Sequence, residues 1–329
     1  MKILGNQKVR QGLLESLARS GPASSYLFLG DSGLGKSRTA LWLASALNCS
    51  AEERPCGVCP SCLKIAHSNH PDVVVQERPA GKTGIGVGDV REQIAATAYR
   101  PYEGRHRVWI VAEAETLTEE AQNALLKTLE EPPGSMVMVL VSSSESALLP
   151  TVSSRCRPVR FQSVAPEELW RELEERGAEP EQARTLAHLA RGRPGVALGW
   201  LENRALWELR CTTLDLLSGL HGAQLWPALE TAARLDKLRA GEEARQSLAA
   251  VLDCCRLFYR DLLHLAASGA EGAVVNRDRL DDLRRLAAEG GIARPRRALE
   301  LLLEASEHLQ ANLNGRLVLQ RLCMHLSRC

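Results

Sequence analysis

One stretch of the sequence constrains the fold more than any other. The apolar run SYLFL, residues 25–29, leads directly into GDSGLGKS, residues 30–37. This octapeptide matches the pattern G-x-x-x-x-G-K-[ST], in which backbone N–H groups turn toward phosphate oxygens at the start of a helix. Because a strand-like run precedes the motif and a helical pattern follows it, the sequence predicts a P-loop on an α/β sheet.

The residues of this loop have predicted roles in holding a nucleotide. Gly30, Gly33 and Gly35 allow the backbone to turn around the phosphates. Lys36 would reach the β- and γ-phosphates, and the Ser37 hydroxyl would bind Mg²⁺. ATP or ADP with Mg²⁺ is therefore the expected ligand. The alternative is a glycine-rich turn without a ligand, and the flanking strand and helix argue against it.

Strand-like and helix-like patterns alternate over residues 1–162. The strand-like runs are SYLFL, DVVVQ, VWIVA, MVMVLVS and RPVRFQ, and helical patterns separate them. Strands that are apolar along their whole length and alternate with helices predict a parallel sheet covered on both faces. Asp89 is the predicted N-cap of the helix VREQIAATA, because its side chain can accept hydrogen bonds from free backbone N–H groups.

Beyond residue 162 the strand patterns stop. Residues 163–204 contain three short helical segments and are predicted to form a small helical lid. Residues 205–329 are helical throughout and are predicted to form an all-α C-terminal oligomerisation domain. The predicted architecture is therefore an α/β nucleotide-binding domain, a three-helix lid and a helical C-terminal domain.

Composition narrows the classes of protein that the chain can belong to. The 41 basic and 40 acidic residues leave a formal net charge of +1, which argues against a protein whose overall field attracts nucleic acid. No window approaches 18 consecutive apolar residues, so no membrane span is predicted. The first residues lack the pattern of a secretory signal, so we expect a cytoplasmic protein with reduced cysteines.

Four of the ten cysteines lie close together in the sequence. Cys49, Cys56, Cys59 and Cys62 have the spacing C-x6-C-x2-C-x2-C directly after the P-loop helix. Two linked C-x-x-C knuckles are typical of tetrahedral Zn²⁺ sites, although the first gap is wider than usual. Four thiolates complete the zinc shell, so the sequence predicts a structural site that contributes on the order of 10 kcal/mol. Unrelated reduced thiols are the alternative.

Several longer segments resemble the clamp-loader branch of the AAA+ ATPases. These are AEAETLTEEAQNALLKTLEEPP, LLPTVSSRC, the opening segment ILGNQKVRQGL, the helix IGVGDVREQI and the segment HLQANLNGRLVLQRLCMHL near residue 320. The zinc insertion is also a feature of that family. The resemblance covers essentially the whole chain. It implies an AAA+ domain with a lid, a helical collar, and a role in loading a sliding clamp onto primed DNA within bacterial DNA polymerase III.

The resemblance also implies roles for particular residues. Arg155, in the Ser-Arg-Cys motif, corresponds to an arginine finger that completes the ATP site of a neighbouring subunit. Glu113 corresponds to the catalytic base, but Ala112 replaces the Asp that holds the metal. Gly195 replaces a phosphate-sensing arginine. These departures favour a non-motor subunit with a vestigial base and little or no ATPase activity, and the alternative is a gamma/tau-like motor subunit.

The expected partners follow from the same resemblance. They are a gamma/tau-like motor subunit and a delta-like clamp-opening subunit, with the sliding clamp and primer–template DNA reached through the complex. An autonomous P-loop ATPase and a zinc-dependent DNA-binding module remain rival hypotheses. Ser142 or Ser143 is a candidate γ-phosphate sensor, and the basic run 105–107 either contacts DNA phosphates or is a solvated loop.

Overall fold

The chain forms two compact units. In the computed structural model, residues 3–79, 82, 84–97, 100–220, 222–237, 244–311 and 313–328 are described. The first unit comprises Met1–Leu169 together with Gly192–Gly195, and the second comprises Trp170–Arg191 together with Val196–Cys329. This division assigns parts of residues 163–204 to each of the two units. The domain boundaries at residues 162 and 204 therefore stay a prediction.

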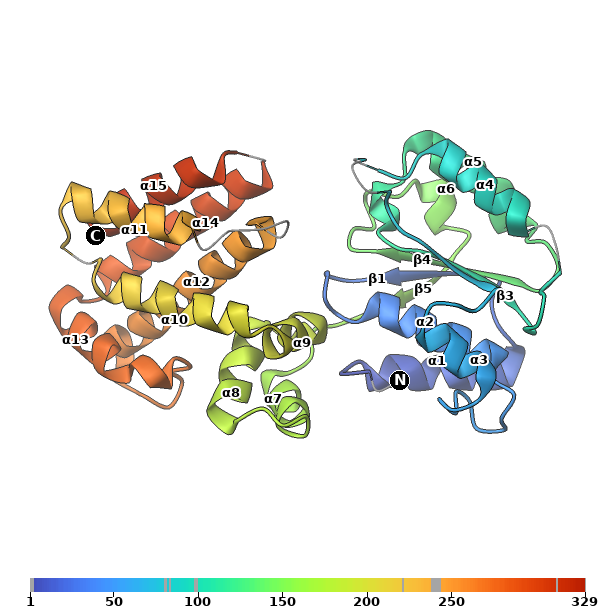
Figure 1. Ribbon diagram of the computed structural model, residues 1–329, viewed down its shortest axis with the longest axis horizontal. Coiled ribbons are helices and arrows are strands. Elements are labelled where there is room, and N and C mark those ends of the chain that lie inside the picture. The colour runs from blue at the N-terminus through green and yellow to red at the C-terminus, as the bar shows by residue number, and fades with distance from the viewer. Residues whose placement is uncertain are drawn as a thin grey trace. The chain divides into compact units, whose positions relative to one another are not determined.

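A five-stranded parallel sheet forms the centre of the first unit (Figure 1). Its strands are β1 (Ser25–Leu29), β2 (Val73–Gln76), β3 (Arg107–Val111), β4 (Met136–Ser142) and β5 (Arg157–Arg160), in the order β2-β3-β4-β1-β5. All four pairs of neighbouring strands are parallel, as the sequence predicts. The carboxyl ends of the strands therefore meet along one edge, where the P-loop follows β1.

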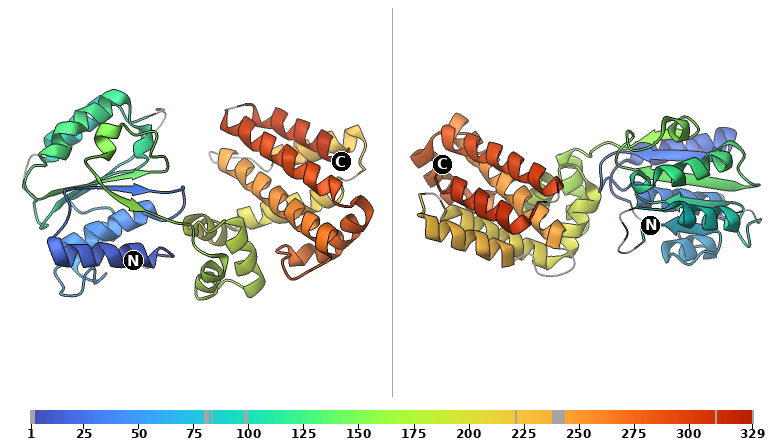
Figure 2. Two further views of the ribbon diagram at one scale, coloured as in Figure 1. Left: turned by 180° about the vertical axis from the view of Figure 1, so that it is seen from behind. Right: turned by 90° about the horizontal axis from the view of Figure 1, so that it is seen from above.

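Helices cover both faces of this sheet (Figures 1 and 2). On one face lie α1 (Gln7–Ser20), α2 (Lys36–Asn48) and α3 (Pro60–Ala66), and on the other lie α4 (Val87–Thr97), α5 (Glu119–Glu130), α6 (Pro150–Ser153) and the 3₁₀ turn η1 (Ala114–Thr116). Successive strand residues point to opposite faces, so Trp109 packs on the α5 side and Ile110 on the α2 side. Burial on both faces explains the apolar runs of the inner strands β1, β3 and β4, whereas the edge strand β5 is mostly exposed and carries two arginines.

Two helix boundaries show how local side chains set the start of a helix. The prediction that Asp89 is an N-cap is wrong, because α4 begins at Val87. Asp89 lies in the first turn, and its carboxylate accepts a hydrogen bond at 3.0 Å from the N–H of Gly86. The side chain thus reaches back to the residue before the helix, as the acidic member of a capping box does. In α5 the Thr118 hydroxyl caps the first turn by accepting from the N–H of Ala121 at 3.2 Å.

The described residues of the second unit form helices and the turns between them. It contains α8 (Pro180–Leu189), α10 (Arg204–Ser218), α11 (Leu225–Lys237), α12 (Ala244–Ser268), the 3₁₀ turn η2 (Arg277–Arg279), α13 (Leu280–Gly290), α14 (Ala293–Gln310) and α15 (Gly315–Leu326). Helices α7 (Pro166–Glu174) and α9 (Pro194–Glu202) each begin in the first unit and continue in the second. Helix α12 packs against α10, α13 and α14, and α11 packs against α15.

A buried charge network fastens η2 to the helices of the second unit. The Arg210 side chain is 1% exposed and donates to both carboxylate oxygens of Asp278, at 2.9 and 2.8 Å. It also donates to Asn276 at 2.7 Å. Burial opposes the charge of Arg210, but its bonds to Asp278 outweigh this effect and raise its pKa. Because Arg210 is buried and Asp278 is 44% exposed, removal of Asp278 would leave an unpaired cation in the core.

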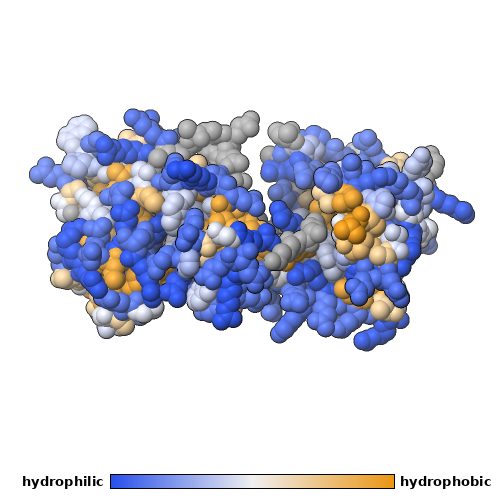
Figure 3. All heavy atoms as spheres, turned by 60° about the horizontal axis from the view of Figure 1, so that its bottom comes forward, coloured by the Kyte–Doolittle hydropathy of each residue, from blue (hydrophilic) through white to orange (hydrophobic). Residues whose placement is uncertain are grey.

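The outer surfaces of both units are mainly hydrophilic on the face drawn in Figure 3, with apolar side chains in small groups. Exposed apolar residues include Val58 next to the cysteine cluster and Trp226 on α11, which are 76% and 80% exposed. No helix among the described residues is long and apolar enough to cross a bilayer.

Candidate nucleotide and zinc sites

The P-loop has the backbone geometry that its glycines allow. Gly30, Gly33 and Gly35 have φ values of 140°, 84° and 85°, which side chains rarely permit. A Cβ atom on Gly30 would also lie 2.7 Å from the carbonyl oxygen of Phe161. Gly35 is the N-cap residue of α2, and Lys36 begins the helix. The helix N-terminus therefore opens from the loop, as an anion-binding site requires.

Lys36 lies folded inside the loop. Its side chain is largely buried, and its Nζ donates to the carbonyl oxygen of Gly30 and, at 2.7 Å, to that of Asp31. Burial lowers the pKa of Lys36, and the nearby carboxylates of Glu115 and Asp31 oppose this shift. The ammonium group is thus held at the centre of the phosphate cradle.

Glu115 is a site residue that the sequence analysis missed. It lies in η1, and one of its carboxylate oxygens accepts hydrogen bonds from the hydroxyl and the N–H of Ser143, at 2.5 and 3.2 Å. The other oxygen is buried without a hydrogen-bond partner. Since Glu115 also raises the pKa of Lys36, its negative charge acts on the cradle. A polar residue in a turn just past β3 was the signal that could have identified it.

The structure distinguishes the two candidate sensor serines. Strand register places Ser142 opposite Leu29, so Ser143 follows at the level of Gly30 in the P-loop. The Ser142 hydroxyl is buried and donates to the carbonyl oxygen of Ser144 at 2.8 Å. Of the two, Ser143 is therefore the one whose hydroxyl contacts a carboxylate beside the loop.

Glu113, the predicted vestigial base, is held by a neighbouring charge. Its carboxylate lies 3.4 Å from Nε of Arg78, and its side chain is 55% exposed. Its backbone has a φ of 53°, in the left-handed region that non-glycine residues seldom adopt. Ala112, directly before it, offers no ligand atom beyond its backbone, whose N–H donates to Gln76 at 2.9 Å.

Gly195 packs directly against the P-loop. Its N–H donates to the carbonyl oxygen of Gly33 at 2.8 Å, and a Cβ atom here would lie 3.1 Å from that same oxygen. The position that the resemblance assigns to a phosphate-sensing arginine is therefore a close backbone contact in this chain. Asn6, in the opening segment, also contacts the loop through a hydrogen bond to Leu34 at 3.3 Å.

The four predicted zinc ligands come together at the end of α2 and the start of α3. The Sγ atoms of Cys49, Cys56, Cys59 and Cys62 all lie within 4.8 Å of one another. The Cys49 and Cys59 sulfurs are 3.9 Å apart. A tetrahedron with Zn–S bonds of about 2.3 Å has edges of about 3.8 Å, so the spacing fits Zn²⁺.

Backbone N–H groups support the thiolate form of this cluster. Cys56 donates to the Cys49 sulfur at 3.4 Å, and Cys59 donates to the Cys56 sulfur at 3.3 Å. Burial acts to raise the pKa of Cys59, but hydrogen bonds that include those from the backbone of Cys62 and Ser50 lower it to about 6. The burial of Cys62 raises its pKa to about 12. A metal binding here would therefore displace protons from the thiols.

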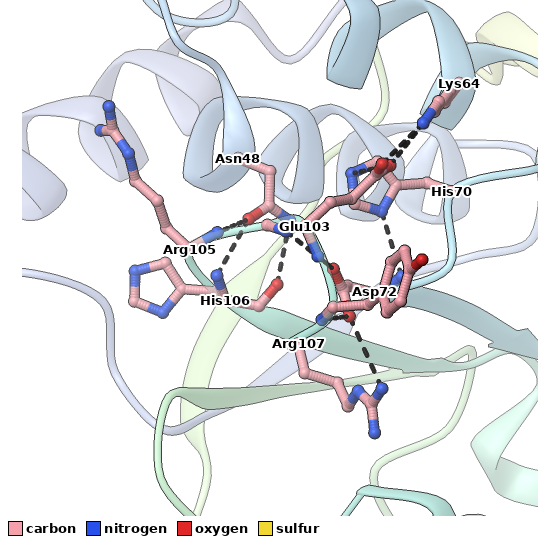
Figure 4. A network of polar contacts seen from close by, with 10 residues as sticks. Asn48, Lys64, His70, Asp72, Glu103, Arg105, His106 and Arg107 are labelled. Atoms are coloured by element: carbon pink, nitrogen blue, oxygen red, sulfur yellow. Dashed lines mark hydrogen bonds and ion pairs between the residues drawn. The ribbon is translucent and has the colours of Figure 1, made fainter. Parts of the chain in front are cut away.

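Polar contacts hold the loop that precedes β3 against Asp72 and Lys64 (Figure 4). The Asp72 side chain is fully buried, and its carboxylate accepts from the N–H groups of Tyr102, Glu103 and Gly104 at 2.6, 2.9 and 2.8 Å. Burial acts to raise the pKa of Asp72, but these hydrogen bonds outweigh it and lower the pKa. Glu103 in turn pairs with Lys64 of α3 at 2.7 Å. This pair joins the loop to helix α3, which carries Cys62 of the cysteine cluster.

The basic run 105–107 does not form one exposed patch. Arg105 is exposed, and Asn48 accepts from its backbone N–H at 2.9 Å. His106 is half-buried, and this burial lowers its pKa. Arg107 lies 3.5 Å from Asp72 and donates to the carbonyl oxygen of Ala96. Arg107 is therefore engaged in contacts within the protein, and the lowered pKa of His106 favours its neutral form. Arg105 is the exposed cation of this run.

Arg155 follows the short helix α6. Its Nε donates to the Glu130 carboxylate at 2.7 Å, and one terminal nitrogen donates to the carbonyl oxygen of Thr151 at 2.9 Å. The side chain remains 35% exposed. Glu130 lies at the end of α5, where the helix dipole disfavours an acidic residue, and Arg155 supplies the compensating charge. The neighbouring Cys156 is buried, which raises its pKa to about 12.

Comparison with known proteins places this chain in a family. Residues 5–165 match the family described as "DNA polymerase III, delta subunit". The delta-prime subunit of DNA polymerase III from Bacillus subtilis is 28% identical over 97% of this chain and 95% of its own length. These matches support a clamp-loader subunit of DNA polymerase III. The predicted family, with its likeness to delta-prime subunits, is therefore confirmed.

Relatives of two kinds occur within this family. The delta-prime subunit from Pseudomonas aeruginosa is 38% identical, over 42% of this chain and 43% of its own length. The gamma/tau subunit from Mycobacterium tuberculosis is 29% identical over 99% of this chain, which spans only 60% of that relative. The similarity thus extends to both the non-motor and the motor alternatives.

Proposed function

We propose that this protein is a non-motor, delta-prime-like subunit of the DNA polymerase III clamp loader. In this role it supplies Arg155 to the ATP site of a neighbouring motor subunit. The observation that carries the proposal is the position of Arg155, which is partly exposed and oriented by Glu130 and Thr151. An arginine so presented can stabilise charge on a transferred phosphoryl group across an interface.

The chain's own nucleotide site supports a non-motor role. Its cradle is intact, but Ala112 carries no ligand atom in its side chain and Gly195 packs against Gly33. The carboxylate of Glu113, the residue that corresponds to the catalytic base, is paired with Arg78. We therefore infer that ATP or ADP with Mg²⁺ binds for structural stability, with little or no hydrolysis, and that the cysteine cluster binds a structural Zn²⁺.

The partners follow from this role. A gamma/tau-like motor subunit would receive Arg155, and a delta-like clamp-opening subunit would lie on the other side. The helices from residue 205 onward would form the collar that joins the subunits, in an AAA+ arrangement with residues 163–204 as the lid. Through this cytoplasmic complex the protein would help load the sliding clamp onto primer–template DNA.

The test is ATP hydrolysis by the reconstituted clamp loader with Arg155→Ala. Arg160→Ala is a matched control, because Arg160 is also exposed and pairs with a glutamate at 2.9 Å. We expect both complexes to assemble, with hydrolysis at the affected site falling by about 10³-fold or more for Arg155→Ala alone. Normal hydrolysis by the assembled Arg155→Ala complex would rule out the arginine finger.

The intact P-loop supports a second candidate, a gamma/tau-like motor subunit. Single-turnover hydrolysis by the isolated chain with Mg²⁺ separates the two functions. Absence of turnover supports the non-motor subunit, whereas clear hydrolysis would favour the motor subunit.

A further inference from the structure

The position of the missing metal-binding Asp adjoins a carboxylate on another strand. We propose that Glu77, at the carboxyl end of β2, supplies the Mg²⁺-binding carboxylate that Ala112 lacks, together with the hydroxyl of Ser37. The inference deepens the proposed nucleotide site and rests on nucleotide binding at the P-loop. It concerns what holds the cation, directly or through a water molecule, and it does not require that the chain hydrolyse ATP.

Strand register brings Glu77 beside Ala112. Gln76 of β2 lies opposite Val111 of β3, and the N–H of Ala112 donates to the carbonyl oxygen of Gln76 at 2.9 Å. Glu77 and Ala112 are the residues that directly follow these two parallel strands. Neighbouring strands are only about 4.8 Å apart, and a glutamate is one methylene longer than the Asp it would replace. A side chain from β2 can therefore approach the space in front of β3.

Both residues belong to the face of the sheet that carries α2. Val75 and Ile110 pack in the hydrophobic cluster of that face, and side chains two residues apart on a strand share a face. The structure bears this out, because a cavity of about 330 Å³ is lined by Ser37 of α2 as well as by Glu77 and Ala112. Ser37 and Glu77 thus line one cavity, which Ala112 also borders.

Among the described carboxylates that closely follow β2 and β3, Glu77 is the one without a partner in the protein, so it is free to bind a cation. Arg78 pairs with Glu113 at 3.4 Å, and Ser143 donates to Glu115. Glu77 has no hydrogen bond or ion pair with any residue that the structure describes. An unpaired carboxylate oxygen is a hard ligand of the kind that Mg²⁺ prefers, and Mg²⁺ is commonly held by only one or two carboxylates together with phosphate oxygens.

The experiment measures how strongly Mg²⁺ tightens ADP binding to the full chain. Calorimetric titrations with ADP are carried out in Mg²⁺ and in EDTA, and the ratio of the two dissociation constants is compared among variants. The variants are Glu77→Gln, Ala112→Asp and the double variant Glu77→Gln with Ala112→Asp. Glu92→Gln, which removes an exposed carboxylate from α4, is the control.

We expect Mg²⁺ to tighten ADP binding to the unmodified protein and to the Glu92→Gln control. Glu77→Gln should lower this ratio by about tenfold while leaving binding in EDTA unchanged, because a single charged ligand is lost. Ala112→Asp should restore the ratio in the double variant but change it little when Glu77 is present. This pattern supports the proposal, and unchanged binding in EDTA shows that the variants are folded.

Two results would overturn the proposal. One is a Glu77→Gln variant with the full effect of Mg²⁺, and the other is an unmodified protein whose ADP binding does not respond to Mg²⁺ or is absent. Neither result bears on the role in the clamp loader, which the Arg155→Ala complex tests independently. Conversely, a result that rules out Arg155 as an arginine finger would not change the expected ratios of the ADP dissociation constants in Mg²⁺ and in EDTA.

Discussion

The cysteine cluster and the nucleotide site lie in the same unit but are built in opposite ways. The four sulfurs come from 14 consecutive residues, and they all lie within 4.8 Å of one another. The nucleotide site draws on the P-loop, the strand ends at Glu77 and Ala112, the turn at Glu115, and Gly195. The first site is a local product of the sequence, and the second exists only after the sheet has formed.

This difference explains why the two sites tolerate change differently. A zinc shell that loses one thiolate loses a quarter of its ligands, and among the described residues the cluster contains only the four cysteines. A site assembled from several strands has neighbouring positions at the strand ends, and our proposal is that Glu77, after β2, supplies the ligand that Ala112 lacks. The cysteine cluster should therefore be sensitive to single substitutions, whereas the nucleotide site should respond in smaller steps.

The largest effect is expected for Cys59→Ser. This change should abolish stoichiometric zinc binding and unfold the segment around α3, because apparent zinc free energies in small sites are on the order of 10 kcal/mol. Metal analysis and thermal unfolding of the purified protein are the measurements. Cys211→Ser, which alters a cysteine of α10 outside the cluster, is the control. An unmodified protein that contains no zinc would contradict the prediction.

An intermediate effect is expected for Glu115→Gln. The carboxylate places negative charge beside Lys36 and Ser143, where a γ-phosphate would be repelled. Neutralising it should tighten ATP binding relative to ADP binding by about tenfold, which corresponds to about 1.4 kcal/mol. Competition titrations of the two nucleotides measure the ratio, with Glu120→Gln in α5 as control. An unchanged ratio would show that Glu115 lies outside the reach of the γ-phosphate.

The smallest effect is expected for Gly195→Ala. Its Cβ would press on Gly33, at a cost of about 1 kcal/mol in stability. Gly199→Ala in the same helix α9 meets no atom within 4 Å and should be neutral or stabilising, by up to about 1 kcal/mol. Chemical denaturation of both variants gives the comparison. If Gly195→Ala were as stable as Gly199→Ala, the close packing against the P-loop would not constrain this position.

Much of the first unit could be predicted from the sequence. The five strand-like runs became the five parallel strands, and burial on both faces accounts for the apolar residues of the inner strands β1, β3 and β4. The N-cap was predicted three residues too late, at Asp89 instead of Gly86, since the pattern of polar residues does not show which N–H group a carboxylate will reach. Glu115 was overlooked because only folding brings η1 against Ser143.

The sequence by itself determined the P-loop, the cysteine spacing and the family, because each depends on residues that are close together in the chain. Only the tertiary structure decided which charged side chains are paired within the protein and which are free to bind a ligand. It pairs Arg107 with Asp72, Arg78 with Glu113 and Glu130 with Arg155. It also leaves Glu77 unpaired among the described residues, in a cavity with Ser37. The physical reason is that charge pairing depends on distance in space, and strand register sets that distance between residues far apart in sequence.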